Sequence, residues 1–238
     1  MKVTLSQTAP KLNRSNLEDI IAIVKTHMNE SDLIVFPELA LNGYLLQDKL
    51  SEDAWRLEEL HELCELSKYV DIVVGAAVRE GKVFRNSALY FSEGKLVNQH
   101  NKVHLPNYGM FEEARYFSAG EGFESFNVSN MKIATLVCED LWNANVHKQL
   151  FEESPDLIIT LVASPARGFS DEGLLIEDQW HALLKSAALH CEAKVVFVNR
   201  VGFEDGLGFW GGSCIIDRDA QILEKLPHYD VITQTFEI

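Results

Sequence analysis

The sequence of 238 residues has little positive charge and few cysteines, and both shortages exclude classes of function. It contains 21 Lys and Arg against 36 Asp and Glu, which gives a formal net charge of −15. Because nucleic acids and anionic membranes are bound by clustered Lys and Arg, we expect neither as a partner. The four cysteines are scattered without a CxxC pair, so we expect free thiols in a reducing compartment and no zinc site.

Long apolar runs are also missing, and no stretch approaches the roughly 20 residues that span a bilayer. The first five residues, MKVTL, lead directly into a strand pattern and lack the features of a signal peptide. We therefore expect a cytoplasmic protein. Since the chain shows no internal repeat, low-complexity segment or linker, we expect one domain over residues 1–238.

Strand and helix patterns alternate along the chain, which predicts an α/β fold with mixed sheets. Strands are predicted at residues 3–5, 33–36, 72–78, 87–91, 95–97, 131–137, 157–162 and 194–199. Helices are predicted after residues 13–15 and at 51–68, 142–153 and 175–192, with a hairpin-like end at 209–217 and 220–226. Residues 98–122 lack periodicity but carry aromatic side chains, and such a long loop is usually functional.

Cys138 lies where an apolar run meets an acidic turn. Residues 133–137 read IATLV, and Glu139 and Asp140 follow the cysteine. A strand that ends at a cysteine and turns into a helix presents a nucleophile on a rigid scaffold, with backbone N–H groups aimed at its target. Because free cysteines more often pack as small hydrophobes, a catalytic interpretation needs partners for this thiol.

Two other junctions supply candidate partners. Glu38 follows the apolar residues 33–37, and Lys102 follows the run at 95–97 a few residues later. Residues just past strand ends gather at one edge of an α/β sheet. A thiol with an ordinary pKa of about 8.5 is mostly protonated at neutral pH. We therefore interpret Glu38 as a candidate base and Lys102 as a candidate cation for the thiolate and for a developing oxyanion.

Alternative interpretations remain at this stage. Glu139 and Asp140 would disfavour the thiolate if their charges faced the sulfur. Glu38 alone could cap a turn, and Lys102 alone could be a solvated surface lysine. A Cys–His pair of the papain-like kind would need one of four histidines, namely His104, His147, His181 or His190. We rank this pair lower because none of these histidines follows a comparable strand.

These motifs resemble those of the nitrilase superfamily of carbon–nitrogen hydrolases, and most closely the glutaminase domain of glutamine-dependent NAD synthetase. The matching stretches are FPELALNGY at 36–44, NKVHLP at 101–106, LPNYGMFEEARYF at 105–117, LVCEDLW at 136–142, NRVG at 199–202 and GGSCIID at 211–217. They occur in order over nearly the whole chain. The resemblance implies a four-layer α-β-β-α sandwich.

The resemblance also implies catalytic roles. Glu38 would be the general base, Lys102 the stabiliser of the tetrahedral intermediate and Cys138 the nucleophile. A second glutamate after the lysine supports the site in this family. Glu113 matches it best, with Glu112 as the close alternative.

Substrate contacts are implied at four further positions. The backbone N–H of Glu139 would complete the oxyanion hole, and Tyr108 and Ser164 match substrate-binding residues of the glutaminase branch. That branch carries a basic residue where this sequence has Ser170, and the nearby cation is Arg167. We therefore expect Arg167 to reach the substrate anion instead.

We accordingly predict a cysteine-dependent amidase that hydrolyses a non-peptide C–N bond without metal or organic cofactor. The substrate class stays open among ω-amides of dicarboxylates, glutamine, aliphatic amides and N-carbamoyl amines. No Ser-Gly-Gly-x-Asp nucleotide motif is present in these residues, so we do not expect a self-contained synthetase. Alternatives are a glutaminase subunit that feeds ammonia to a separate synthetase partner, and a non-catalytic binding protein. The resemblance also implies a homodimer or higher homo-oligomer.

Overall fold

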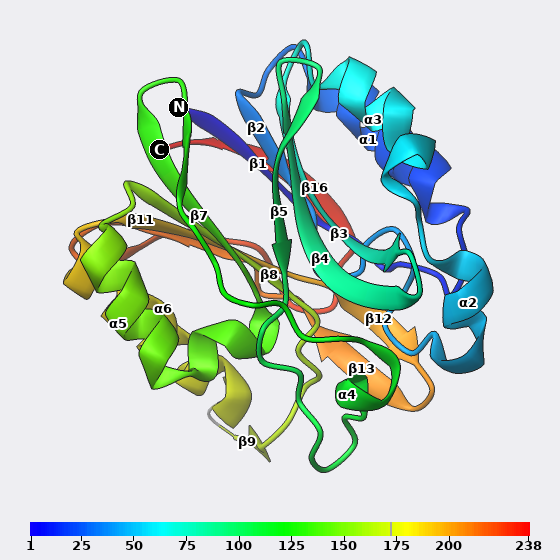
Figure 1. Cartoon of the computed structure of the whole chain (residues 1–238). Helices are drawn as coiled ribbons and strands as arrows, with labels where there is room; N and C mark the ends of the chain where they lie inside the picture. Colours follow the sequence, from blue (N-terminus) through cyan, green and yellow to red (C-terminus); the bar gives the residue numbers. More distant parts are fainter. Residues whose placement is uncertain (172) are drawn as a thin grey trace.

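A computed structural model describes residues 1–171 and 173–238, and most strands of this part form two six-stranded mixed sheets (Figure 1). In the first sheet the order is β16 (Ile232–Glu237), β1 (Lys2–Gln7), β2 (Leu33–Val35), β3 (Asp71–Glu80), β4 (Val83–Ser92) and β5 (Lys95–Asn101). In the second it is β15 (Ile222–Lys225), β14 (Cys214–Ile216), β11 (Lys194–Asn199), β8 (Leu157–Val162), β7 (Met131–Val137) and β6 (Phe126–Val128).

Each sheet has three parallel strands at its centre and antiparallel strands outside them. β1, β2 and β3 are parallel, as are β7, β8 and β11. Because β4 is antiparallel to both β3 and β5, β5 ends at the same edge as β3. The residues that follow β2, β5, β7 and β8 therefore meet at one end of the molecule.

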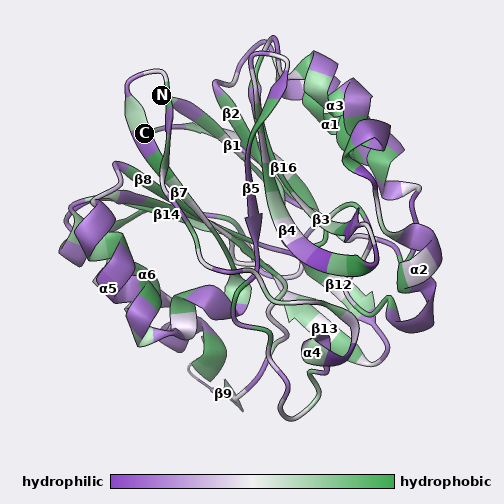
Figure 2. Ribbon diagram, in the orientation of Figure 1, coloured by the Kyte–Doolittle hydropathy of each residue, from purple (hydrophilic) through white to green (hydrophobic). Residues whose placement is uncertain are grey.

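The two sheets pack face to face and carry helices on their outer faces (Figures 1 and 2). The interface between the sheets is filled by apolar side chains such as Leu5 and Val73 of the first sheet and Leu161 and Val198 of the second. Helices α1 (Asn16–His27) and α3 (His61–Leu66) cover the first sheet. Helices α5 (Ala144–Glu153) and α6 (Leu175–Cys191) cover the second. The implied four-layer α-β-β-α sandwich is thus confirmed.

Burial on both faces explains why the strand predictions succeeded. All six residues of β8 are buried, so the strand reads as one continuous apolar run. The shorter elements are the helices α2 (Leu50–Asp53) and α4 (Glu113–Tyr116), the 3₁₀ turns η1 (Gln47–Lys49), η2 (Leu57–Leu60) and η3 (Cys138–Trp142), and the strands β9 (Phe169–Ser170), β10 (Gly173–Leu174), β12 (Val201–Glu204) and β13 (Leu207–Trp210).

The predicted helix at 51–68 is partly wrong, because the chain is extended at residues 54–56, near its start. The Trp55 backbone N–H donates to the Ala77 carbonyl at 2.8 Å, and the Arg79 N–H donates to the Trp55 carbonyl at 2.7 Å. These bonds attach Trp55 to the edge of β3 beside Val78 and leave α2 and α3 as separate short helices. The buried Trp55 ring stabilises this break, which helical periodicity does not reveal.

The C-terminal prediction is partly wrong. β14 does pair with β15, but β13 pairs with β12 in a hairpin outside both sheets. Strand β16 was not predicted, because its residues are only partly buried and mostly polar. It pairs with β1 and lies at the edge of the first sheet.

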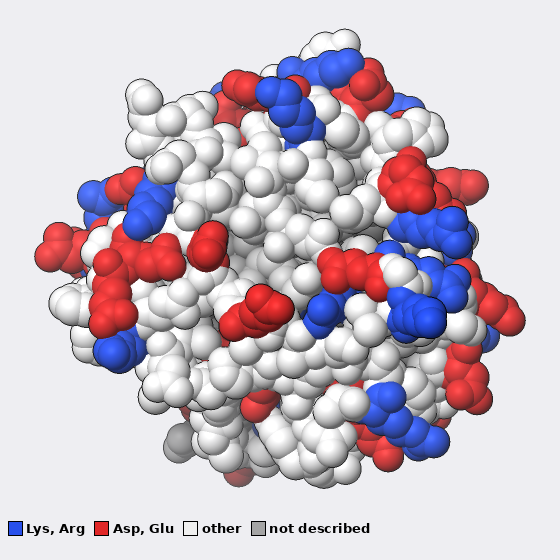
Figure 3. Space-filling view, viewed as in Figure 1, with Lys and Arg blue, Asp and Glu red and all other residues white. Residues whose placement is uncertain are grey.

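The surface agrees with the acidic composition. On the face shown in Figure 3, Asp and Glu side chains are interspersed with Lys and Arg. Across residues 1–171 and 173–238, each helix is too short or too polar to cross a bilayer.

Candidate active site

Glu38, Lys102 and Glu113 form one buried hydrogen-bonded cluster at the edge where the strands end. The Lys102 Nζ donates to Glu38 Oε1 at 2.8 Å and to Glu113 Oε1 at 2.7 Å. The side chains of Glu38 and Lys102 are fully buried, and that of Glu113 is 5% exposed. Glu112 lies outside the cluster, where its exposed carboxylate contacts Arg115 at 3.5 Å.

The two carboxylates are held by further donors. Asn86 Nδ2 and the Ala163 backbone N–H donate to Glu38 at 2.7 and 2.8 Å. The Tyr44 hydroxyl donates to Glu113 at 2.5 Å. Each carboxylate is therefore fixed in orientation by two or more elements, as a preorganised site requires.

The turn that carries Glu38 packs closely on β3. A Cβ on Gly75 would lie 2.4 Å from both the Leu39 N and the Pro37 carbonyl oxygen. Only glycine leaves room for this approach, which brings Glu38 over the sheet edge. Leu39 completes the turn with a φ of +50°.

One lysine serves two carboxylates, so the cluster carries an excess negative charge when all three groups are ionised. Burial favours the neutral amine of Lys102, but the charges of Glu113 and Glu38 outweigh it and hold its pKa well above the ordinary value. Burial and the charge of Glu38 raise the pKa of Glu113 to about 7, against the opposing effect of Lys102. The cluster can therefore hold or release a proton near neutral pH.

Cys138 begins the 3₁₀ turn that follows β7 and has a φ of +45°. An L-residue rarely adopts this conformation, which occurs at strained functional turns. Burial raises the pKa of the Cys138 thiol well above its ordinary value; Glu38 and Glu113 add to this effect, and Lys102 opposes it. The thiol therefore stays protonated at neutral pH and needs a base to become a nucleophile.

The acids next to Cys138 in sequence are not among the main causes of this raised pKa. Glu139 accepts a hydrogen bond from the Tyr108 hydroxyl at 2.9 Å. The Asp140 carboxylate is turned away from the thiol and accepts a hydrogen bond from a His100 ring nitrogen at 2.7 Å. The charges that act on the thiol are those of the buried cluster, which lie far away in sequence.

The histidines of the alternative Cys–His pair are engaged elsewhere. A ring nitrogen of His104 contacts Asp140 at 3.3 Å, that of His147 contacts the Leu141 carbonyl at 2.7 Å, and that of His190 contacts Ser186 at 3.2 Å. His181 lies 3.9 Å from Glu177, beyond hydrogen-bond distance. These contacts leave Glu38 as the better candidate base. In the described residues, 1–171 and 173–238, no group of three or more His, Cys, Asp and Glu is placed to hold a metal ion.

Cys138 lines a narrow pocket with Glu139, Ser164 and Arg167. Its walls also include the aromatic and apolar residues Tyr44, Pro106, Phe111, Trp142, Ala163, Pro165 and Trp180. The Ser164 hydroxyl accepts the Trp180 indole N–H at 3.0 Å, and the Arg167 guanidinium lies 5.7 Å from the centre of the Phe111 ring. Tyr108 is half exposed and lines an adjoining pocket with Arg167.

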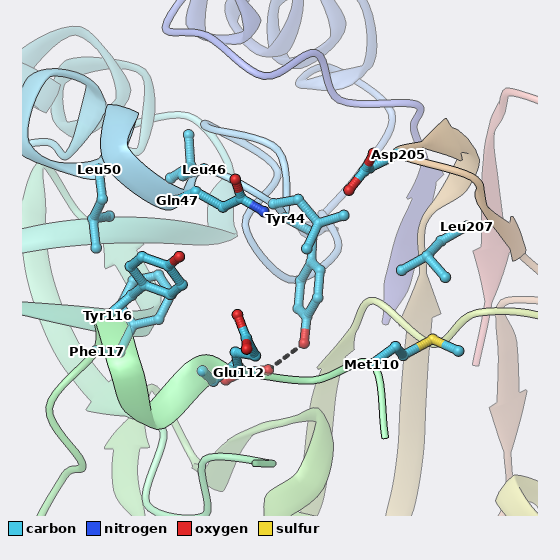
Figure 4. Close-up of a pocket in the computed structure, with 12 residues that line it drawn as sticks. Tyr44, Leu46, Gln47, Leu50, Met110, Glu112, Tyr116, Phe117, Asp205 and Leu207 are labelled. Atoms are coloured by element: carbon cyan, nitrogen blue, oxygen red, sulfur yellow. Dashed lines mark hydrogen bonds between the residues drawn. The ribbon is translucent and has the colours of Figure 1, made fainter. Parts of the chain in front are cut away.

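A second pocket is lined by Tyr44 and Glu113 and is drawn in Figure 4. The Tyr44 side chain lines both pockets, and its hydroxyl bond to Glu113 is the dashed line in the figure. The walls of the second pocket are largely apolar and include Leu46, Leu50 and Met110.

Sequence reasoning missed three side chains that shape the site: Tyr44, Asn86 and Asp140. The backbone of Tyr44 is held in place, because its N–H donates a hydrogen bond to Glu204 Oε1 at 2.9 Å. Glu204 is itself paired with buried Arg200 at 2.7 Å. Asn86 lies in β4 between the polar residues Arg85 and Ser87, so nothing in its sequence context marked it.

Comparisons with known proteins identify the family of the chain. The family model described as carbon-nitrogen hydrolase matches residues 2–236. The glutamine-dependent NAD(+) synthetases of Acinetobacter baylyi and Thermotoga maritima are 30% and 29% identical; they align with 96% and 100% of this chain, and each with 42% of its own length. The chain thus spans less than half of these relatives.

Solved structures are similar throughout the chain. The glutamine-dependent NAD+ synthetase of Acinetobacter baumannii superposes with a TM-score of 0.87 at 29% identity, over 98% of this chain and 44% of that one. A carbon-nitrogen hydrolase of Helicobacter pylori superposes with a TM-score of 0.88 at 21% identity, over 100% of this chain and 89% of that one. The second likeness concerns the fold alone.

Proposed function

This chain belongs to the carbon-nitrogen hydrolase family, and on that basis we propose that it hydrolyses the C–N bond of a small amide through a thioester on Cys138. The observation that carries the proposal is the buried Glu38–Lys102–Glu113 cluster, whose charges act on a thiol that lines a pocket. The family and the alignment over residues 2–236 support one domain across the chain.

In the first step Glu38 removes the thiol proton and the Cys138 sulfur attacks the amide carbon. The raised pKa of the thiol makes a base necessary; burial is the main cause of that rise, and the charge of Glu38 adds to it. The carbonyl oxygen becomes an oxyanion, which Lys102 and the backbone N–H of Glu139 stabilise. Burial of the lysine strengthens this effect, since water does not screen its charge.

The tetrahedral intermediate then collapses. The C–N bond breaks, the leaving nitrogen takes the proton from Glu38, and ammonia or an amine departs. Water gives a proton to Glu38 and attacks the thioester carbon. The C–S bond breaks, the carboxylic acid leaves, and the thiol regains its proton. No electrons are exchanged with a cofactor in either half of the reaction.

Glu113 and Tyr44 support these steps without a covalent role. Glu113 accepts a hydrogen bond from the Lys102 ammonium and so restrains its position, and Tyr44 fixes Glu113. We propose Ser164, Arg167 and Tyr108 as substrate contacts, because they line the pocket or its mouth. The guanidinium of Arg167 fits a substrate that carries a carboxylate.

The decisive experiment compares Cys138→Ala with Cys64→Ala. Cys64 is partly buried against the first sheet and donates to the Gly94 carbonyl, away from the proposed site. We expect Cys138→Ala to abolish ammonia release from a panel of primary amides and carbamoyl compounds, and Cys64→Ala to retain it. Mass spectrometry of the wild type with substrate should detect the acyl-enzyme. Full turnover by the Cys138 variant would refute the mechanism.

A second candidate is a glutaminase that supplies ammonia to a separate synthetase partner. It is favoured by the relatives, which are named glutamine-dependent NAD(+) synthetases and of which this chain aligns with 42%. This function requires glutamine turnover that a synthetase chain stimulates. Robust hydrolysis of simple amides with none of glutamine would count against it.

We also propose that the chain forms a homodimer or higher homo-oligomer, which light scattering would test. A non-catalytic binding protein is the remaining alternative; it would gain support if iodoacetamide labelled Cys138 no faster than Cys64, Cys191 and Cys214.

A further inference from the structure

Asp140 is a fully buried carboxylate two residues after Cys138, and the proposed reaction gives it no chemical step. Five donors converge on its oxygens. They are the backbone N–H groups of Val103 at 3.0 Å, His104 at 2.9 Å and Val137 at 3.2 Å, and ring nitrogens of His100 at 2.7 Å and His104 at 3.3 Å. A carboxylate has about four acceptor sites, so these donors occupy both of its oxygens and fix its orientation.

The donors come from two segments that carry the proposed catalytic groups. Val103 and His104 directly follow Lys102, and Val137 directly precedes Cys138. The carboxylate therefore joins the lysine segment to the cysteine turn. Its pKa is lowered: burial opposes ionisation, but the hydrogen bonds from His100 and His104 outweigh it, so the group stays charged and accepting.

Both segments need such a restraint. Cys138 has a φ of +45°, a conformation that is strained for an L-residue and persists only where its surroundings enforce it. The hydrogen bond from the Val137 backbone N–H to the Asp140 carboxylate links the residues on either side of Cys138. Lys102 directly follows β5 and begins an irregular segment, so the hydrogen bonds at residues 103 and 104 fix the chain just beyond it.

We propose that Asp140 is a positioning residue: its carboxylate sets the spacing between Lys102 and the Cys138 turn. The proposal rests on the hydrolysis proposed above. The Cys138 thiolate and the oxyanion depend on the nearby ammonium, so a shift of either segment weakens both. A misplacement of about 1 Å can reduce a rate on the order of 100-fold.

The test uses Asp140→Asn and Asp140→Glu in the full chain. Asn offers one acceptor oxygen and places an NH₂ group where donors now converge, while Glu keeps the charge on a side chain one methylene longer. Asp71→Asn is the matched control, because it removes a partly buried carboxylate that accepts the Tyr90 hydroxyl at 2.9 Å at the opposite end of the first sheet.

Two readouts are measured on the folded variants: the split between kcat and KM, and the pH dependence of Cys138 alkylation by iodoacetamide. We expect both Asp140 variants to lower kcat on the order of 100-fold with little change in KM. The alkylation midpoint should move to higher pH, because a displaced Lys102 stabilises the thiolate less. Asp71→Asn should match the wild type in both readouts.

Wild-type kcat and alkylation in both Asp140 variants would overturn the proposal. Failure of both variants to fold would also overturn it, since Asp140 would then determine folding and not site geometry. Alkylation needs no substrate. If the wild type hydrolyses no amide, the proposed function fails, while the alkylation midpoints still decide whether Asp140 positions the thiol.

Discussion

The Lys102 ammonium lies 2.8 Å from the Glu38 carboxylate, and both side chains are fully buried. A buried ion pair stabilises little by comparison with apolar packing, but removing one partner leaves an uncompensated charge. Here the same lysine also neutralises Glu113. The arrangement is expensive to build and sensitive to change, which is typical of a site kept for chemistry.

Lys102→Met should therefore destabilise the fold as well as remove the proposed oxyanion contact. Two buried carboxylates would lose their cation, and we expect a loss of about 3–5 kcal/mol in the free energy of unfolding. Urea denaturation measures it. The double variant Lys102→Met/Glu113→Gln carries one fewer buried charge and should recover part of that loss. Equal stability of the single variant and the wild type would show that the lysine does not neutralise the pair.

The raised pKa of Glu113, about 7, predicts a pH dependence of stability. The ordinary glutamate pKa is about 4.3, so between these values the folded carboxyl keeps a proton that the unfolded one has lost. The folded state then binds more protons, and stability falls as pH rises through this window. Glu113→Gln does not titrate, so its stability relative to the wild type should increase from pH about 5 to pH about 8.

Glu112→Gln is the control for this measurement, because Glu112 is the exposed neighbour of Glu113. Its unfolding free energy should follow the wild-type pH dependence. Parallel pH curves for the wild type and Glu113→Gln would contradict the raised pKa.

The positions of Glu38 and Cys138 could be predicted because each follows a strand that is buried on both faces. Such strands read as unbroken apolar runs, and the residue that ends the run stands out. The place of Lys102 beside these residues was harder to predict from the sequence, because the strand that precedes it, β5, is only partly buried. The family resemblance supplied what periodicity did not.

Tertiary contacts account for what could not be predicted. Trp55 interrupts a helical pattern because β3 offers its backbone better-placed hydrogen-bond partners. Asp140 was interpreted as a charge next to the thiol, but its carboxylate turns toward residues 100–104. The direction of a side chain in a turn depends on partners that lie far away in sequence, so local pattern does not determine it.

Arg167 leads to a prediction about substrate choice. Its guanidinium lines the Cys138 pocket, where it would pair with a carboxylate on the substrate. Arg167→Gln should raise KM for amides that bear a carboxylate and leave KM for neutral amides nearly unchanged. A lost charged contact of about 1.5–3 kcal/mol corresponds to a tenfold or larger effect. Steady-state ammonia release on matched substrate pairs measures this, and an equal change for both classes would exclude a direct contact.

The strained turn at Cys138 predicts an unusual order of stability between two variants. With a φ of +45°, alanine at this position keeps the strain of an L-residue, about 1–2 kcal/mol, whereas glycine relieves it. Glycine costs roughly 0.5–1 kcal/mol in backbone entropy, so Cys138→Gly should equal or exceed Cys138→Ala in stability. At Cys64, inside α3, the order should reverse by about 1 kcal/mol in favour of alanine. Thermal or urea unfolding of the four variants gives the comparison. If alanine were the more stable substitution at both positions, the turn at Cys138 would be unstrained.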